Sequence, residues 1–302
     1  MTGFAEEVKE EAKLYPSIYS RQLEKTDIVL HTERIFVSGA GDSFAASLTG
    51  TALSGYRGEA VDPRELSLYP KGERVTVIAV SLGGRTKSLI ESVSLHKDKG
   101  SKVVVVTGNT ESPLAELGDM VVQVVHPSYV KGSGFGSYVS MTAAIAGLLG
   151  VRVKPAGKLQ CYPGNIPVGI PFFIGEAWSY GLAYFAMLKM HEGLGWPSRS
   201  ERLEQFMHAT IFSLKEYETP IILYPREELP ENLISTLTEK SSPVFLGDLI
   251  NSEAVNDVDK MVCTAQSLTR LIAECISREG LIEPFYRRRR SEAGKLAKAI
   301  YT

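Results

Sequence analysis

The sequence lacks long apolar runs, a secretory leader and a strong excess of charge of either sign. No uninterrupted apolar stretch reaches the roughly 18 residues that a transmembrane helix needs, so we expect no membrane span. The acidic stretch 1–13 has no apolar core of the kind found in signal peptides. The formal net charge is −2, which argues against a nucleic-acid-binding surface that extends over the whole chain.

Cysteine is also scarce. The three cysteines are Cys161, Cys263 and Cys275, and their spacing fits no common metal-binding motif, so we expect no metal. An odd number of cysteines leaves at least one thiol unpaired, which is typical of a protein in a reducing compartment. We therefore expect a cytoplasmic location.

The chain does contain enough apolar residues for two hydrophobic cores. It has 302 residues, of which 44% are hydrophobic and 23% charged, as is ordinary for a globular protein. Because a single core rarely grows beyond about 250–300 residues, we expect two domains.

Short β-branched runs alternate with segments of helical periodicity, which is typical of a parallel, doubly wound α/β sheet. The expected strands are 34–38, 75–80, 102–107 and 120–125 in the first half, and 171–175, 220–224, 243–247 and, as a candidate, 260–264 in the second. The expected helices are 4–23, 89–99, 139–149, 178–191, 269–278 and 286–301, and a glycine- and serine-rich turn is expected at 130–137.

We therefore predict an α/β fold of two tandem domains of similar plan. The first covers 1–155 and includes the arm helix, and the second covers 169–302 and includes the basic tail. A segment rich in proline and glycine, 156–168, is the predicted linker.

The most informative stretch follows the expected strand 75–80 and reads Ser81-Leu82-Gly83-Gly84-Arg85-Thr86-Lys87-Ser88. Such a turn at the start of a helix directs hydroxyls and backbone N–H groups at one point, where the helix dipole favours an anion. Arg85 and Lys87 add positive charge. A phosphate group is therefore the expected ligand of this turn.

A second turn of this kind, Gly39-Ala40-Gly41-Asp42-Ser43, follows the expected strand 34–38. A dinucleotide-binding fingerprint needs a third glycine where Phe44 stands, so a nicotinamide site is disfavoured. The plainer interpretation is that Ser43 and Ser81 only cap helices, since capping and phosphate binding use the same geometry.

Two charged residues, Lys189 and Glu192, lie three positions apart on the otherwise apolar helix expected at 178–191, which should be buried. Because buried charges are costly unless paired or used, they either form an ion pair where the helix resurfaces or act in a site. His208 could equally be a satisfied core or surface histidine, and the four arginines 287–290 could be a solvated helix face.

Together these residues make the chain similar to the sugar isomerase (SIS) family. The family includes the isomerase half of glucosamine-6-phosphate synthase and stand-alone phosphosugar isomerases and deaminases. Its two phosphate-binding loops read Gly-x-Gly-x-Ser and Ser-x-Ser-Gly-x-Thr. The resemblance therefore assigns phosphate binding to the hydroxyls of Ser43, Ser81 and Thr86.

The resemblance also implies catalytic roles for four residues. The family's Glu-x-x-x-Lys-x-x-Glu helix matches Lys189 and Glu192, so Glu192 would move the proton between sugar C1 and C2 while Lys189 stabilises the developing oxyanion. His208 would open the pyranose ring, although Gln205 stands where the family has a glutamate. Lys298, in a Leu-Ala-Lys ending, would face the carbonyl carbon.

Two positions depart from the family pattern. The middle serine of the second loop is Gly83, and the backbone N–H of Gly84 and the charge of Arg85 are expected to compensate. The first carboxylate of the helix motif is replaced by Phe185. Both changes leave the identity of the sugar open.

The implied activity is conversion of glucosamine 6-phosphate into fructose 6-phosphate and ammonia, without a cofactor or metal. Isomerisation of a hexose 6-phosphate without deamination and a non-catalytic sugar-phosphate sensor are the alternatives. The chain starts at its arm helix, so no glutaminase half is expected. The implied partners are a phosphorylated hexose or amino sugar and a second copy of the chain in a homodimer, rather than a nucleic acid or a membrane.

Overall fold

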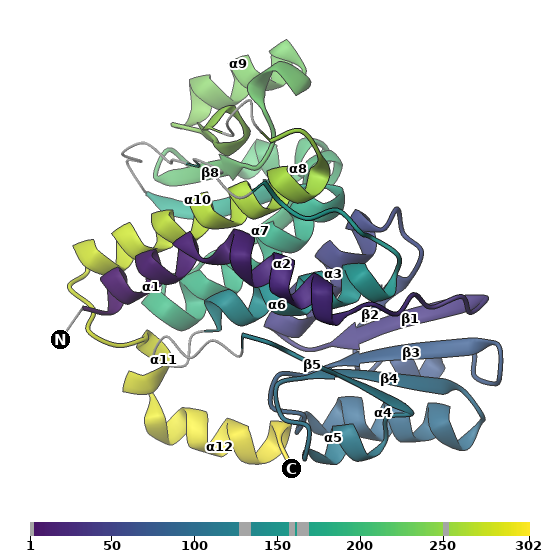
Figure 1. The fold of residues 1–302 in the computed structure, drawn as a ribbon. Helices are drawn as coiled ribbons and strands as arrows, with labels where there is room; N and C mark the ends of the chain where they lie inside the picture. Colours follow the sequence, from purple (N-terminus) through teal and green to yellow (C-terminus); the bar gives the residue numbers. More distant parts are fainter. Residues whose placement is uncertain (1–2, 127–133, 157–160, 162–168, 250–253) are drawn as a thin grey trace. The chain divides into compact units, whose positions relative to one another are not determined.

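The computed structural model describes residues 3–126, 134–156, 161, 169–249 and 254–302, and it contains two parallel β-sheets (Figure 1). The chain divides into two compact units. Of the described residues, the first-sheet unit comprises 17–126, 134–154 and 287–302, and the second-sheet unit comprises 3–16, 155–156, 161, 169–249 and 254–286. Each unit has its own sheet and its own hydrophobic core.

The first sheet has five parallel strands in the order β2-β1-β3-β4-β5. Its central strands are continuous apolar runs, as expected where both faces of a sheet are covered. The chain passes from β1 to β2 on one side and then returns to the other side of β1 as β3. The strands are β1 (Arg34–Gly39), β2 (Glu59–Val61), β3 (Val75–Val80), β4 (Lys102–Thr107) and β5 (Met120–Gln123).

Helices cover both faces of the first sheet (Figure 1). On one face α4 (Lys87–Asp98) and α5 (Pro113–Glu116) supply Leu89, Val93 and Leu114 to the core. On the other face α3 (Asp42–Leu53) and α6 (Phe135–Leu148) pack closely, because a Cβ added at Gly50 would lie 2.7 Å from Cγ2 of Ile145. The unit also contains most of α2 (Tyr15–Lys25), η1 (Leu66–Leu68) and α12 (Arg290–Ile300).

The second sheet has four parallel strands in the order β7-β6-β8-β9, which repeats the pattern of the first four strands of the first sheet. Its core contains Phe172, Ile174 and Phe206. The strands are β6 (Ile170–Gly175), β7 (Ser200–Arg202), β8 (Glu218–Ile222) and β9 (Val244–Phe245). The helices are α1 (Phe4–Lys13), α7 (Ala177–Lys189), η2 (Met190–Leu194), α8 (Leu203–His208), η3 (Thr210–Ser213), η4 (Arg226–Glu228), α9 (Glu231–Lys240), η5 (Leu246–Leu249), α10 (Asp257–Arg278) and α11 (Phe285–Arg288).

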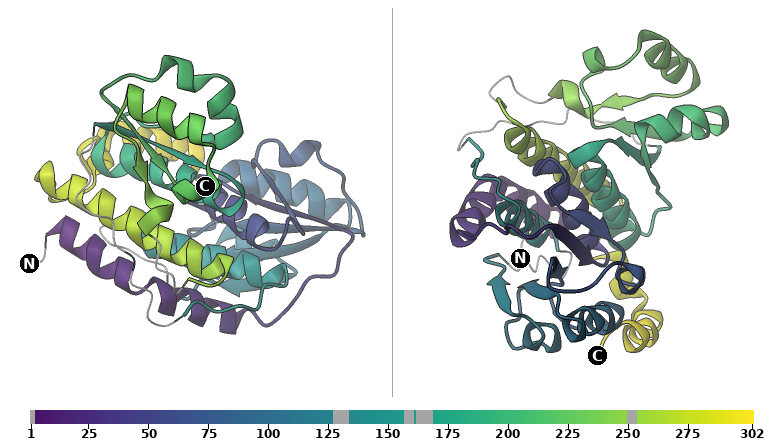
Figure 2. Two further views of the ribbon diagram at one scale, coloured as in Figure 1. Left: turned by 90° about the horizontal axis from the view of Figure 1, so that it is seen from above. Right: turned by 90° about the vertical axis from the view of Figure 1, so that its right-hand side faces the viewer.

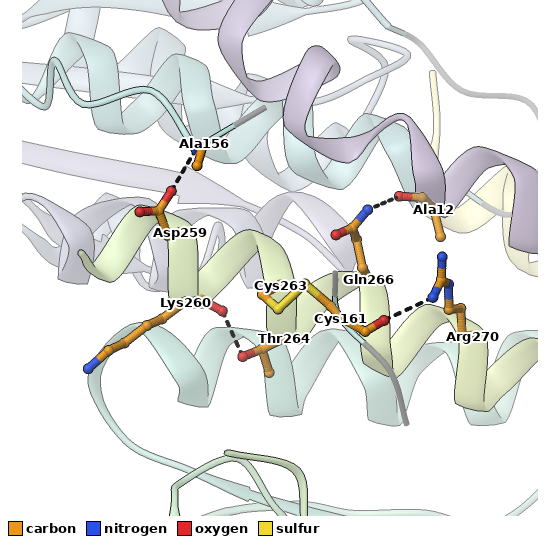
Figure 3. Close-up of a disulfide and its surroundings, with 9 residues drawn as sticks. All are labelled: Ala12, Ala156, Cys161, Asp259, Lys260, Cys263, Thr264, Gln266 and Arg270. Atoms are coloured by element: carbon orange, nitrogen blue, oxygen red, sulfur yellow. Dashed lines mark hydrogen bonds between the residues drawn. A yellow bond between two sulfur atoms is a disulfide. The ribbon is translucent and has the colours of Figure 1, made fainter. Parts of the chain in front are cut away.

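The long helix α10 joins the two ends of the second-sheet unit. Helix α1 lies along it, as two views show (Figure 2), and Gln266 donates a hydrogen bond of 2.8 Å to the carbonyl of Ala12. A disulfide joins Cys161 to Cys263 on the same helix (Figure 3). Two hydrogen bonds flank the disulfide: the Asp259 carboxylate accepts from Ala156 N–H, and the Arg270 guanidinium donates to the Cys161 carbonyl.

The disulfide corrects the expectation drawn from the cysteine count. Cys161 and Cys263 lie 102 positions apart, so nothing in the sequence indicated their pairing. Cys275 is the free cysteine, and burial raises the pKa of its thiol to about 11. The inference of a reducing compartment from unpaired cysteines therefore loses its basis.

Two further expectations differ from the structure. The candidate strand 260–264 is helical and lies in α10, where Thr264 Oγ1 donates to the Lys260 carbonyl one turn back. The ends of the chain also differ from the expected domains. Helix α1, the first part of the expected arm helix, belongs to the second-sheet unit, and α12, in the basic tail, belongs to the first-sheet unit. Most of the predicted linker 156–168 and the start of the predicted turn 130–137 lie outside the described residues.

Candidate functional site

The two predicted phosphate-binding loops follow β1 and β3, where the first sheet reverses its direction of growth. In open α/β sheets this point, at the carboxyl ends of the strands, is where ligands bind. A close backbone approach fixes the second loop: Gly84 has φ +64°, and a Cβ there would lie 1.9 Å from Ser112 Oγ. Only glycine fits at this position.

The hydroxyls of the second loop converge. Ser81 Oγ lies 3.3 Å from Thr86 Oγ1 and accepts a hydrogen bond of 3.2 Å from the N–H of Gly84. Both side chains are almost fully buried. In the first loop, Ser43 is also buried, and its hydroxyl lies 3.4 Å from the thioether sulfur of Met141.

The helices behind these loops begin without a side-chain cap. Gly41 is the N-cap of α3 and Thr86 is the N-cap of α4, and neither makes a side-chain capping bond. The expectation that Ser43 or Ser81 caps a helix is therefore wrong, because Gly41 and Thr86 hold those positions. Uncapped helix N-termini present backbone N–H groups and the positive end of the dipole to an anion.

Two helices of the second-sheet unit, α7 and α10, begin with side-chain hydrogen bonds. Asn256 caps α10, and its Oδ1 accepts bonds of 3.0 Å from the N–H groups of Val258 and Asp259. At the start of α7, Glu176 N–H donates to Ser179 Oγ at 2.9 Å. These side chains use donors at the helix starts. The starts of α7 and α10 are therefore less suited to an anion than those of α3 and α4.

The C-terminal segment lies against the second loop within the same unit. Thr302 N–H donates to the Arg85 carbonyl at 2.9 Å, Arg85 Nε donates to the Thr302 carbonyl, and Tyr301 forms an antiparallel bridge with Thr86. Lys87 Nζ donates to the Lys298 carbonyl at 2.8 Å. The structure thus brings Lys298 beside the phosphate loop, with its side chain exposed.

A cavity of about 570 Å³ opens beside these loops. Ala40 of the first loop and Thr86 of the second contribute to its wall, and Ala299 and Ile300 close it from the C-terminal helix. Its volume is within the range of small-molecule sites, and among the described residues Thr86 lines it whereas Ser43 and Ser81 do not.

Lys189 and Glu192 form an ion pair in the second-sheet unit. Their Nζ and Oε2 atoms are 2.8 Å apart, with side-chain exposures of 1% for Lys189 and 42% for Glu192. The plainer interpretation, an ion pair where the helix resurfaces, is therefore confirmed, and of the two residues only Lys189 is buried. The Lys189 ammonium also lies 5.3 Å from the centre of the Phe185 ring, so the aromatic that replaces the family's carboxylate contacts this lysine.

Glu192 lies on a π-helical turn, η2, that continues α7. Such turns are rare and are frequent at functional sites, because the extra residue changes where the side chains point. The π-turn places Glu192 at the surface while Lys189 stays inside. The sequence indicated the spacing of the two residues but not this turn.

His208 ends α8 and is largely exposed. Its Nε2 lies 2.9 Å from Oε1 of Glu204. The carboxylate partner is therefore Glu204, one helical turn back, and not the position of Gln205 where the family motif has its glutamate. Helical i, i+4 spacing was the signal that could have identified it.

The predicted site residues fall into groups. The first-sheet unit brings together the loop residues and Lys298, whereas the second-sheet unit pairs Lys189 with Glu192 and His208 with Glu204. Within the described residues, no group of three or more His, Cys, Asp or Glu side chains could hold a metal ion. Over the same residues, no helix has the length and apolar character needed to cross a membrane.

Comparisons with known proteins agree with this arrangement. Residues 28–149 match the family model of the SIS domain. A 3-hexulose-6-phosphate isomerase from Methylomonas aminofaciens is 35% identical over 98 residues, covering 30% of this chain and 51% of that protein. An isomerizing glutamine–fructose-6-phosphate aminotransferase from Aeropyrum pernix is 27% identical over 143 residues, covering 45% of this chain and 23% of that protein. The chain thus spans about half the length of the first relative and about a quarter of the second.

A solved structure extends the similarity over both sheets. Glucosamine-6-phosphate deaminase from Thermotoga maritima superposes with a TM-score of 0.65 at 17% identity, covering 92% of this chain and 95% of that chain. At this identity the comparison shows the fold alone. The match to the SIS domain family covers residues 28–149, which contain the first sheet and both loops.

Proposed function

We propose that the chain is a phosphosugar aldose–ketose isomerase, and that its specific reaction converts glucosamine 6-phosphate into fructose 6-phosphate and ammonia. The observation that carries the proposal is the pair of loops at the switch point of the first sheet, which combine buried hydroxyls with uncapped helix N-termini. Residues 28–149, which contain both loops, match the SIS domain.

The loops suit the phosphate end of the sugar. Ser43, Ser81 and Thr86 supply hydroxyl donors, and the Gly84 N–H donates to Ser81 Oγ within the second loop. Arg85 adds a guanidinium, which binds phosphate oxygens in a bidentate manner. Binding energy from this non-reacting end holds the sugar in register for the chemistry at C1 and C2.

Glu192 is the proposed base. An aldose–ketose change needs one group that removes the C2 proton and returns it at C1, and a carboxylate at a surface π-turn is accessible to substrate. Lys189 holds Glu192 in place through the 2.8 Å ion pair and supplies positive charge near the enolate that forms.

His208 and Lys298 complete the proposed set. His208 would open the pyranose ring by moving the proton between the ring oxygen and the C1 hydroxyl, and the Glu204 carboxylate orients its imidazole. Lys298, carried to the phosphate loop by the C-terminal segment, would place an ammonium near the carbonyl carbon. No step needs a metal or an organic cofactor.

The reaction balances with water as the second substrate. Transfer of the C2 proton of the open-chain amino sugar to C1 gives an imine at C2. Water adds to this imine, the C–N bond breaks, and ammonia leaves as the C2 carbonyl of fructose 6-phosphate forms. The same residues catalyse isomerisation of a neutral hexose phosphate, in which the C2 hydroxyl replaces the amine and no group leaves.

That plain isomerisation is the second candidate. It is favoured by the similarity to 3-hexulose-6-phosphate isomerase, at 35% identity over 98 residues. A sugar-phosphate sensor would need the loops but neither Glu192 nor His208. The matching strand order of the two sheets supports the further proposal that the second-sheet unit is also of SIS type. A homodimer stays a prediction from the family resemblance.

The deciding experiment is an assay of purified protein on glucosamine 6-phosphate and on neutral hexose 6-phosphates, measuring ammonia and ketose. We expect ammonia from the amino sugar. Glu192→Gln should lower kcat by about 10²–10⁴-fold without changing binding. The matched control is Glu239→Gln on α9, which is exposed and far along the chain from the pair, and it should not change kcat.

Phosphate binding has its own pair of variants. Thr86→Val removes a loop hydroxyl at constant shape and should raise KM about tenfold. Arg74→Ala removes an exposed arginine that pairs with Glu33, and it should leave KM unchanged. Turnover of neutral hexoses alone would favour the plain isomerase. Tight binding without any turnover would favour the sensor.

A further inference from the structure

The second-sheet unit has a cavity of its own at the carboxyl ends of its strands. It measures about 540 Å³, within the range of small-molecule sites. Its wall is formed by Trp178 after β6, by Tyr224 and Glu228 after β8, and by Asp248 after β9. The start of α10 closes it with Asp257 and Lys260.

The cavity lies at the switch point of the second sheet. Strand β6 pairs with β7 on one side and with β8 on the other, as β1 pairs with β2 and β3 in the first sheet. The loops after β6 and β8 diverge at this point, where a doubly wound sheet accommodates a ligand. No predicted phosphate or catalytic residue lines this cavity.

The backbone around the cavity is tightly constrained. A Cβ added at Gly247 would lie 2.0 Å from the Tyr224 carbonyl carbon, so the loops after β8 and β9 are in direct backbone contact. Ala177, which precedes Trp178, has φ +44°, a conformation that is costly for any residue with a Cβ. The turn after β6 therefore holds a strained backbone that directs the indole into the cavity wall.

The aromatic part of the wall suits the face of a compact polar molecule. Trp178 and Tyr224 are both partly exposed at the cavity. Burial raises the pKa of Tyr224 to about 12, so its hydroxyl stays neutral and donates toward the Glu176 carboxylate at 3.5 Å. Aromatic faces attract organic cations and stack on the C–H faces of sugars.

The charge of the wall excludes a phosphate and favours a cation. Among the residues that the structure describes, the cavity is lined by four carboxylates, those of Glu227, Glu228, Asp248 and Asp257, and by one ammonium, that of Lys260. Arg226 offsets part of this charge because its Nε lies 3.5 Å from Asp248 Oδ2. The remaining excess is negative, in contrast to the loops of the first sheet, where Arg85 and Lys87 lie.

We propose that this cavity is a second ligand site, separate from the sugar-phosphate loops, which binds an unphosphorylated organic ammonium of monosaccharide size, such as an amino sugar. The aromatic walls bind its body, and the carboxylates of Glu228 and Asp257 bind its ammonium group. The site is independent of the proposed catalytic function.

The test uses the intrinsic fluorescence of Trp178. The chain has two tryptophans, Trp178 and Trp196, so Trp196→Phe leaves Trp178 as the only indole reporter. Glucosamine should change this fluorescence saturably with a Kd in the low millimolar range or below, about 1 mM. Glucose, which lacks the ammonium, should bind at least about fivefold more weakly.

Variants separate the contributions. In calorimetric titrations of the otherwise unaltered chain, Trp178→Ala should weaken glucosamine binding about tenfold, and Asp257→Asn about threefold with a reduced dependence on salt. The control Glu239→Gln should change nothing. Thr86→Val should also leave glucosamine binding unchanged, because the loop of the proposed function takes no part.

Three results would overturn the proposal. They are equal affinity for glucose and glucosamine, unchanged glucosamine affinity in the folded Trp178→Ala variant, and no saturable binding up to about 20 mM. Loss of sugar-phosphate turnover with glucosamine binding intact would instead count only against the proposed function, so the two failures are distinguishable.

Discussion

Loss of the Cys161–Cys263 disulfide should destabilise the second-sheet unit. The bond closes a loop of 102 residues. On the chain-entropy relation, a loop of this size restricts the unfolded chain by about 16 cal/mol/K, which is about 4.7 kcal/mol at room temperature. Native disulfides typically contribute about 2–4 kcal/mol, so the expected loss of unfolding free energy is about 2–5 kcal/mol.

Two neighbouring hydrogen bonds determine whether the folded state also changes when the disulfide is lost. Ala156 stays bonded to Asp259, and the Cys161 carbonyl stays bonded to Arg270, when the sulfur atoms separate. These contacts hold the segment on α10 in the folded protein, so the native state keeps its shape. The effect then acts on the unfolded chain, which gains freedom once the cross-link is absent.

The assay is urea unfolding of the Cys161→Ser/Cys263→Ser variant beside the wild type, each with and without a reductant. Reductant should shift the midpoint of the wild type and leave the double variant unchanged. Cys275→Ala is the matched control, since it removes the buried free thiol but keeps the disulfide, and it should still respond to reductant. Three titratable thiols in unreduced, unfolded wild type, or a loss below about 1 kcal/mol, would refute the reasoning.

Three further predictions concern the first-sheet unit. Burial is the main cause that lowers the pKa of His96, so the fold favours the neutral ring. The contribution of His96 to the free energy of unfolding is complete above the pKa of the unfolded chain, about 6.5, and declines as the pH falls below that value. His96→Gln should flatten this acid decline, measured as urea midpoints against pH, and an unchanged decline would contradict it. Gly84→Ala should cost at least about 2 kcal/mol in thermal unfolding, because φ is +64° and the new Cβ meets Ser112 Oγ. Gly83→Ser should change the free energy of unfolding by less than about 0.5 kcal/mol, since a Cβ added at Gly83 would meet no neighbouring heavy atom within 4 Å. It should tighten sugar-phosphate binding in calorimetry. A weaker affinity would count against the loop as the phosphate site.

Local sequence patterns predicted the central strands well. The strands 75–80 and 102–107 match their expected bounds because each is rich in valine and other β-branched residues and is followed by turn residues. Strands β2 and β7 were missed: they have three residues each and include charged side chains, and only pairing with a neighbour defines them. Periodicity carries no signal for such short edge strands.

Contacts between distant parts of the chain could not be predicted from the sequence. The loop glycines and hydroxyls could be recognised because they are adjacent in sequence and follow a strand. The bridge between Thr86 and Tyr301, and the pairing of Cys161 with Cys263, join residues that are far apart and have no local signature. The motif at Lys189 was recognised from spacing, but that spacing does not indicate the π-turn on which Glu192 lies.

Solvent hydrogen exchange tests the central claim most directly. Fructose 6-phosphate is incubated with the protein in deuterated water, and deuterium at C1 is followed by NMR for wild type, Glu192→Gln and the control Glu239→Gln. The account predicts deuterium incorporation by wild type and control, and none above background by Glu192→Gln despite unchanged sugar-phosphate binding. Incorporation by Glu192→Gln at the wild-type rate would contradict it.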